Sequence, residues 1–112
     1  MRYLPNRGHW IWMDFTPHAG HETAGRRPAL VLSSAEFNKI TGMCLACPAT
    51  TTRRPYRFQV PIPDGEPVDG VVMPEQIRSV DFVARRVQFI SVASPELVEQ
   101  VTAIVESLID PQ

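Results

Sequence analysis

Residues 28–48, PALVLSSAEFNKITGMCLACP, decide the fold, because they contain two apolar runs joined by a short connection. Residues 28–32 form a short continuous apolar run of the kind found in strands buried on both faces, and residues 43–48 form another apolar strand. The connection contains one short predicted helix over 35–40, with Ser33 or Ser34 as its cap and Gly42 at its end. A parallel crossover needs a dozen or more residues, usually helical, so the sequence predicts an antiparallel sheet.

Outside this stretch, closely spaced turn signals divide the chain into further short strands. We expect them over 10–15, 56–62, 70–73, 77–82 and 87–92, with 56–62 at a sheet edge because Pro61 has no N–H to donate. Ser94-Pro95-Glu96 predicts the start of a C-terminal helix. Leu97, Val101, Ile104 and Leu108 repeat at helical spacing with Val98, Val105 and Ile109 beside them, so we expect their face to be buried. The predicted class is mainly β with a C-terminal helix, as a small antiparallel barrel or a strongly curved sheet.

The length of 112 residues predicts a single domain spanning 1–112. Hydrophobic residues make up 44% of the chain, an ordinary globular share that excludes a disordered protein and a disulfide scaffold. No stretch approaches the roughly 20 apolar residues of a membrane span, and residues 1–10 lack the apolar core of a signal peptide. We therefore expect a cytoplasmic protein with no membrane partner.

Charge is unevenly distributed, although the formal net charge is only −1. Residues 1–60 carry eight basic and three acidic side chains, whereas residues 94–112 carry four acidic side chains and no basic one. This pattern favours a localised anion-binding site. The alternative is that the preference for arginine, which supplies ten of the eleven basic residues, reflects genome composition.

Two segments bring arginine and hydroxyl groups to the ends of predicted strands. Residues 16–26 form a long polar loop that contains His21 and Glu22, and Arg27 follows it directly before a proline, which restricts its backbone to extended conformations. Residues 50–52 are three threonines at the end of another strand. Arginine together with hydroxyl donors favours recognition of a phosphate oxyanion. The alternatives are a solvated His-Glu pair and β-branched residues that only fill a strand.

Cys44 and Cys47 have the CxxC spacing of redox and zinc sites. Residues three apart in a strand point to opposite faces, so these sulfurs could not share a metal or form a disulfide. The chain also has no second cysteine pair and no glycine-rich nucleotide motif. We interpret both cysteines as core thiols, and we expect no metal and no cofactor.

A series of motifs recurs in order along nearly the whole chain. They are Trp12-x-Asp14-Phe15-x-Pro17, Gly20-x-Glu22-x-x-Gly25-x-Arg27-Pro28, Val31-Leu32-Ser33, Phe37-Asn38, Thr41-Gly42, Pro48-x-Thr50, Gly70-Val71-Val72, and Glu75-Gln76 with Ile77-Arg78-Ser79-Val80-Asp81. Together they resemble the MazF/PemK (Kid) toxins of bacterial toxin–antitoxin systems, and the MazF branch is the closer one. The resemblance implies an SH3-like antiparallel β-barrel with a C-terminal helix, in a homodimer.

The resemblance also implies an activity. Such toxins are metal-independent endoribonucleases that cut single-stranded mRNA at short sequences and so inhibit translation and growth. The 2′-hydroxyl attacks its own phosphate and leaves a 2′,3′-cyclic phosphate and a 5′-hydroxyl. The implied catalytic residues are Arg27, Thr50 and Glu22. The implied partner is an acidic, MazE-like antitoxin, through which alone the toxin would meet DNA.

One departure leaves the general base open. Where the PemK branch has an arginine and an aspartate, this chain has Met73 and Glu75, so the base remains unassigned among Glu22, His21 and Glu75. The predicted substrate-binding set combines these loops with an arginine and aromatic hairpin, and it comprises His21, Arg26, Thr51, Arg53, Arg54, Tyr56, Arg57, Glu75 and Gln76. For the hairpin, the alternative is a solvated turn.

Two other functions fit the same fold. A CcdB-like toxin binds DNA gyrase without cutting RNA, but it depends on a tryptophan near the C-terminus, whereas both tryptophans of this chain lie in the first predicted strand, at Trp10 and Trp12. A catalytically inactive SH3-like interaction module is disfavoured because both Arg27 and Thr50 are retained.

Overall fold

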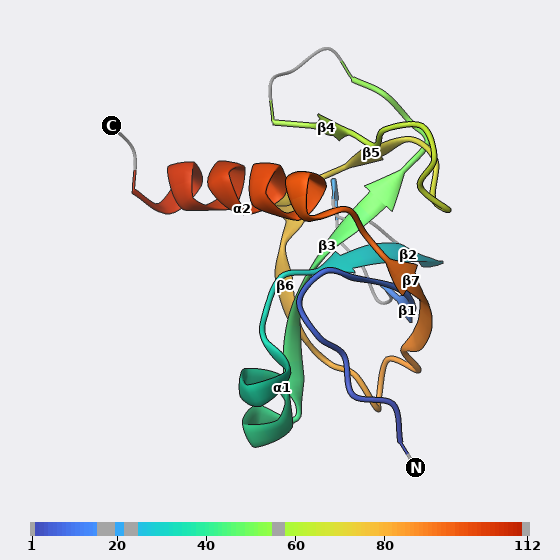
Figure 1. Cartoon of the computed structure of the whole chain (residues 1–112), viewed down its shortest axis with the longest axis vertical. Helices are drawn as coiled ribbons and strands as arrows, with labels where there is room; N and C mark the ends of the chain where they lie inside the picture. The colour runs from blue at the N-terminus through green and yellow to red at the C-terminus, as the bar shows by residue number, and fades with distance from the viewer. Residues whose placement is uncertain (1, 16–19, 22–24, 55–57, 111–112) are drawn as a thin grey trace.

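The structure, a computed structural model, describes residues 2–15, 20–21, 25–54 and 58–110. Seven strands, two α-helices and one 3₁₀ helix (η1) lie in these residues (Figure 1). Their order is β1 (His9–Asp14), β2 (Arg26–Val31), α1 (Ala35–Thr41), β3 (Met43–Thr50), β4 (Val60–Pro61), β5 (Val71–Val72), η1 (Pro74–Gln76), β6 (Arg78–Asp81), β7 (Gln88–Val92) and α2 (Pro95–Ile109). No helix of the described part is long and apolar enough to cross a membrane.

The strand β3 organises the sheet. Along one edge it pairs with β2, which is followed by β1 and β7. Along its other edge it pairs first with β6 and then with β5, which continues to the edge strand β4. All six pairings are antiparallel, which confirms the predicted sheet. Because β6 pairs with residues 43–46 of β3 and β5 pairs with residues 49–50, the two halves of β3 lie in different parts of the sheet.

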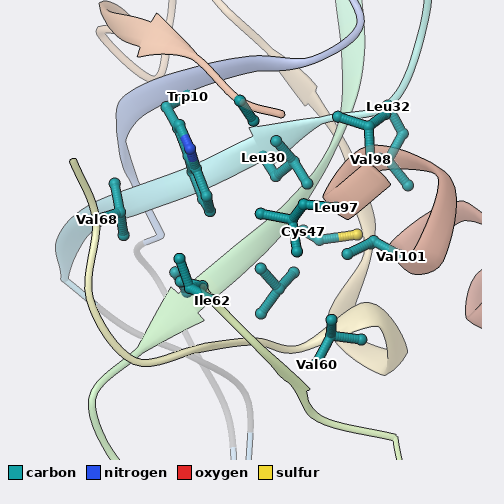
Figure 2. Packing of buried hydrophobic residues seen from close by; sticks show 13 residues of the cluster. Trp10, Leu30, Leu32, Cys47, Val60, Ile62, Val68, Leu97, Val98 and Val101 are labelled. Atoms are coloured by element: carbon teal, nitrogen blue, oxygen red, sulfur yellow. The ribbon is translucent and has the colours of Figure 1, made fainter. Parts of the chain in front are cut away.

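The core forms two clusters on opposite faces of the sheet, as the alternation of strand side chains requires. One face carries Trp10 and Leu30, which pack with Leu97, Val98 and Val101 of α2, as Figure 2 shows. The other face carries a cluster made by Ile11, Met13, Phe15, Ala29, Val31, Cys44, Ala46 and Val80. The helix α2 therefore covers the first face alone, and it begins where Ser94 Oγ accepts the N–H of Leu97 at 3.3 Å.

The two cysteines confirm the interpretation as core thiols. Both are buried and free, with Cys44 in the second cluster and Cys47 in the first. Burial raises the pKa of each thiol to about 12, with the charge of Glu75 adding to the effect at Cys47. Neither sulfur is a nucleophile at neutral pH.

Several predicted boundaries were wrong. The strand β2 starts at Arg26, two residues earlier than expected, β3 continues through Thr50, and β4 is reduced to two residues. Of the two proposed caps Ser34 is the one used, because its side chain accepts the N–H of Phe37, and Gly42 ends α1 in the left-handed region. The 3₁₀ helix η1 was not predicted.

The burial predicted for the end of α2 was also wrong. Leu108 is 40% exposed and Ile109 is 79% exposed. In Figure 1 the last turns of α2 extend past the sheet, so they have no strand beneath them. Helical periodicity identifies an apolar face, but it does not say how far the neighbouring layer reaches.

Candidate active site

Arg27 and Thr50 lie near the same end of two neighbouring strands, β2 and β3. The antiparallel β2–β3 pairing ends at Ala29 and Pro48, and each of the two residues lies two positions beyond that last pair. Both residues line the same two hollows. The antiparallel arrangement thus brings to one place a guanidinium and a hydroxyl that are far apart in the sequence.

Two hollows meet at this pair. The large hollow has a volume of about 470 Å³ and is lined by Trp12, Arg27, Pro28, Ala49, Thr50, Thr51, Thr52, Pro67, Val68, Asp69 and Ile90. The small hollow has a volume of about 190 Å³ and is lined by His21, Arg27, Thr50, Thr52, Arg54, Gln59, Met73 and Gln76. Arg27, Thr50 and Thr52 line both, so a ligand that spans the two hollows would pass over them.

The Thr50 hydroxyl is oriented by the chain that follows it. Its Oγ accepts the backbone N–H of Thr52 at 3.2 Å. A hydroxyl that accepts this bond keeps its own hydrogen for a second partner. Thr50 can therefore donate to an oxyanion placed beside Arg27.

A glycine supports the Thr50 backbone from behind. Gly70 has a φ of +103°, and a Cβ at this position would lie 2.1 Å from the carbonyl oxygen of Thr50. A side chain cannot fit there, because ordinary contacts with carbon begin near 3.4 Å. The sequence signal was present, since glycine inside a predicted strand often marks a close backbone approach.

A network of hydrogen bonds connects the loops around the small hollow. Gln76 Nε2 donates to the backbone oxygen of His21 at 3.3 Å. Gln59 is bound to the segment that follows β3, since its Oε1 accepts the N–H of Arg54 at 2.8 Å and its Nε2 donates to the oxygen of Thr52 at 3.3 Å. The predicted residues His21, Arg54 and Gln76 are thus held at one hollow with the central pair.

Other predicted residues lie elsewhere. Thr51 lines the large hollow, Arg53 is exposed and lines neither, and Glu75 lies at a separate depression beside Gln76. The predictions for Glu22, Tyr56 and Arg57 fall outside the described residues.

Arg26 is directed away from both hollows. Its Nη1 lies 3.0 Å from Asp14 Oδ1, and its Nη2 donates to the oxygen of Arg86 and to Gln88 Oε1. Arg86 Nε lies 2.8 Å from the other oxygen of Asp14. The hydrogen bonds from Arg86 and then Arg26 lower the pKa of Asp14. Because Asp14, Gln88 and the Arg86 backbone bind the Arg26 guanidinium, Arg26 lies outside both hollows, unlike the prediction that it binds substrate there.

Sequence reasoning missed Trp12, Gln59 and Asp69 as lining residues. Trp12 carried a usable signal, since it follows Trp10 by two residues and so shares its face of β1. Gln59 and Asp69 carried none, because both reach the site through loop paths.

The polar groups at the two hollows are two guanidiniums, hydroxyls, an imidazole, amides and the carboxylate of Asp69. A guanidinium and a hydroxyl can stabilise negative charge on a phosphoryl oxygen, and an imidazole can move a proton near neutral pH. Within the described part of the chain, no group of three or more His, Cys, Asp or Glu side chains is arranged to hold a metal ion.

Comparison with known proteins adds independent findings. A family model described as PemK-like, MazF-like toxin of type II toxin-antitoxin system matches residues 6–109. The endoribonuclease toxin MazF of Escherichia coli K12 is 41% identical over 96% of this chain and 96% of its own length. The crystal structure of MazF from Deinococcus radiodurans matches with a TM-score of 0.92 and 42% identity, over 96% of this chain and 98% of that one. A MazE-MazF crystal structure from the same organism matches with a TM-score of 0.85 and 41% identity, over 96% and 97%.

Proposed function

Because the chain belongs to the family of PemK-like, MazF-like toxins of type II toxin–antitoxin systems, we propose that it is an endoribonuclease toxin that cuts single-stranded mRNA at short sequences. The observation that carries this proposal is the position of Arg27 and Thr50 where the two hollows meet. An RNA strand that crosses both hollows would place one phosphate beside this pair. Cutting mRNA there would inhibit translation and growth in the cytoplasm.

The proposed reaction uses the RNA itself as the nucleophile and needs no metal. The 2′-oxygen forms a bond to the neighbouring phosphorus while the bond from phosphorus to the 5′-oxygen breaks. The products are a 2′,3′-cyclic phosphate and a free 5′-hydroxyl. A base takes the proton of the 2′-hydroxyl, and an acid supplies one to the departing oxygen.

Arg27 and Thr50 would act on the charge that develops during this step. The Arg27 guanidinium neutralises the non-bridging oxygens as phosphorus becomes five-coordinate. The Thr50 hydroxyl, already oriented by the N–H of Thr52, donates to one of the same oxygens. Both groups are charge stabilisers that strengthen their contacts in the transition state.

The positions of the candidates support one choice of general base. His21 shares the small hollow with Arg27 and Thr50, whereas Glu75 lies at another depression. Glu22, the third candidate, lies outside the described residues. We therefore assign the proton transfer to the His21–Glu22 segment and not to Glu75. His21→Gln and Glu22→Gln should each lower kcat and change its pH profile, while Glu75→Gln should leave that profile unchanged.

The proposed partners follow the family. A MazE-like acidic antitoxin would cover the two hollows with their arginines and compete with RNA there, and any contact with DNA would be made by that antitoxin. The MazE-MazF crystal structures that resemble this chain support such a complex. We also propose a homodimer, which sedimentation of the purified protein can test. A CcdB-like gyrase poison and an inactive module are not favoured, since the relatives are named as endoribonucleases.

The decisive experiment removes the guanidinium. Arg27→Ala should fold normally and cut a defined single-stranded RNA about 10²–10³ times more slowly, because one preorganised donor is lost. Arg2→Ala, at an exposed arginine outside both hollows, is the matched control and should cut at the wild-type rate. A folded Arg27→Ala variant with wild-type activity would contradict the proposed site.

A further inference from the structure

We propose that the large hollow is a nucleobase subsite, in which the base stacks on Trp12 and its apolar neighbours while Asp69 accepts hydrogen bonds from N–H donors on the Watson–Crick edge. This inference rests on the proposed function and extends it to a specificity determinant. The consequence is that the enzyme discriminates against uracil at one position of its cleavage site.

The first observation is an apolar platform across three strands. Trp12 of β1 pairs with Pro28 of β2, and Ala49 of β3 follows Pro48, the last β3 residue that pairs with β2. All three line the large hollow. Trp12 is 42% exposed, whereas Trp10 on the same face of β1 is fully buried in the core. The hydrophobic face of the sheet therefore continues into the hollow and is left open there.

An exposed indole over such a platform fits an aromatic ligand. Bases of single-stranded RNA stack on aromatic side chains because every base has an apolar π-face. The hollow also contains Arg27 and Thr50, so a base in it would belong to a nucleotide next to the proposed scissile phosphate. The volume of about 470 Å³ accommodates one nucleotide.

The second observation is the acidic group in this hollow. Asp69 is the one acidic side chain among the described residues that line it, and Arg27 and three threonines line it too. A carboxylate beside an RNA backbone would repel the phosphates. The same carboxylate is favourable where it faces the N–H donors of a base, since an ionised carboxylate is a strong acceptor with two oxygens. Asp69 is therefore suited to the base rather than to the phosphate.

The third observation is that the chain holds Asp69 in place. Its neighbour Val68 is buried in the core, and its other neighbour Gly70 lies against the Thr50 backbone. Further back in the same turn, the carboxylate of Glu66 accepts the indole N–H of Trp10 at 2.8 Å. The Asp69 backbone is thus fixed relative to both Thr50 and the core, which is what reading a base requires.

The chemistry of the four bases then sets the preference. Guanine offers two adjacent donor groups, N1–H and the 2-amino group, which match both oxygens of one carboxylate. Adenine and cytosine each offer one amino group. Uracil offers a single N–H between two carbonyl oxygens, which the carboxylate would repel. The expected order at this position is guanine first, then adenine and cytosine, with uracil last.

The test uses a randomised single-stranded RNA pool, with the 5′ ends of the cleaved products sequenced. Wild type should show one position near the cut at which uracil is depleted. Asp69→Asn should weaken the discrimination at that position alone, by roughly tenfold or more, because a neutral amide also donates to carbonyl oxygens. Asp64→Asn is the matched control, because Asp64 is an exposed acid of the same turn that does not line the hollow, and it should keep the wild-type pattern.

A second pair of variants tests the stacking surface on a single substrate. Trp12→Ala should raise KM by roughly tenfold or more with little change in kcat, and Trp12→Phe should restore most of the affinity. An unchanged base preference in Asp69→Asn, or a KM for Trp12→Ala equal to that of wild type, would overturn the subsite while the enzyme still cut RNA. A wild-type protein that cut nothing in the pool would instead overturn the proposed function, and the subsite with it.

Discussion

The close approach of Gly70 to Thr50 makes a sharp prediction for Gly70→Ala. The new methyl group would start 2.1 Å from the Thr50 carbonyl oxygen and 2.8 Å from the Thr50 carbonyl carbon. Both are backbone atoms, so rotating a side chain cannot relieve the clash. Since ordinary contact begins near 3.4 Å, the two segments must separate by at least about 1 Å. The Thr50 hydroxyl moves with its backbone.

Two costs to stability follow from this substitution. A non-glycine residue at the φ of +103° costs about 1–3 kcal/mol in backbone strain. The forced separation adds the cost of an overpacked core, about 1–3 kcal/mol. For catalysis, a displacement of about 1 Å in a positioned group can cost 10²-fold in rate. We therefore expect Gly70→Ala to lose both stability and roughly 10²-fold in kcat.

Gly65→Ala is the control that separates the two effects. Gly65 has a similar φ of +97°, but a Cβ there meets nothing within 4 Å. Gly65→Ala should therefore have the same backbone strain as Gly70→Ala but keep full activity. The measurement is urea unfolding of both variants, with RNA cleavage per folded molecule determined below the transition. If Gly70→Ala matched Gly65→Ala in stability and also cut RNA at the wild-type rate, the argument that Gly70 positions Thr50 would fail.

Three further predictions concern protonation, salt and the nucleophile. Burial lowers the pKa of His9, so at falling pH the unfolded chain binds a proton there more readily than the folded chain does. The free energy of unfolding should therefore fall as the pH drops below about 6.5, the ordinary histidine pKa. Denaturant titrations at several pH values should show this slope, and His9→Gln should flatten it. For the double variant Arg53→Ala/Arg54→Ala, the plot of log affinity for RNA against log salt concentration should have a slope shallower by about 0.7 per lost phosphate contact. A slope equal to that of wild type would show that neither arginine contacts the RNA. Cleavage should persist in excess EDTA and stop when the 2′-hydroxyl at the scissile phosphate is replaced by hydrogen; cutting of that deoxy substrate would rule out the proposed nucleophile.

Interactions between residues close together in the sequence made much of the fold predictable. The short connection between residues 28–32 and 43–48 excluded a parallel pair, and the structure has those strands antiparallel. Ser94 and Pro95 began the C-terminal helix where expected, and the strand alternation at Cys44 and Cys47 correctly separated the two sulfurs. These results depend on interactions over a few residues, which the sequence displays directly.

Some residues that line the hollows, such as Arg27 and Thr50, could be named from the sequence, but their grouping could not. Arg26 and Arg27 are adjacent arginines of one type, yet one is bound to Asp14 and the other lines both hollows. Their difference arises from their partners on β1, since Arg26 lies opposite Asp14, which binds it, whereas Arg27 lies opposite Met13, which offers no charge. Glu22, His21 and Glu75 were open candidates for the base, and the sequence could not show that His21 lines a hollow with Thr50 while Glu75 lies at another depression.

By itself, the sequence determined the elements, their antiparallel pairing and the chemical groups available for binding a phosphate. The tertiary structure alone decided that Gly70 supports Thr50, that Trp12 is left open at the edge of the core, and that Asp69 faces the same hollow as Arg27. The physical reason is that turns, caps and periodicity follow from short-range forces. The hollows depend on the register of β2 and β3 and on where a distant loop packs, which no local pattern specifies.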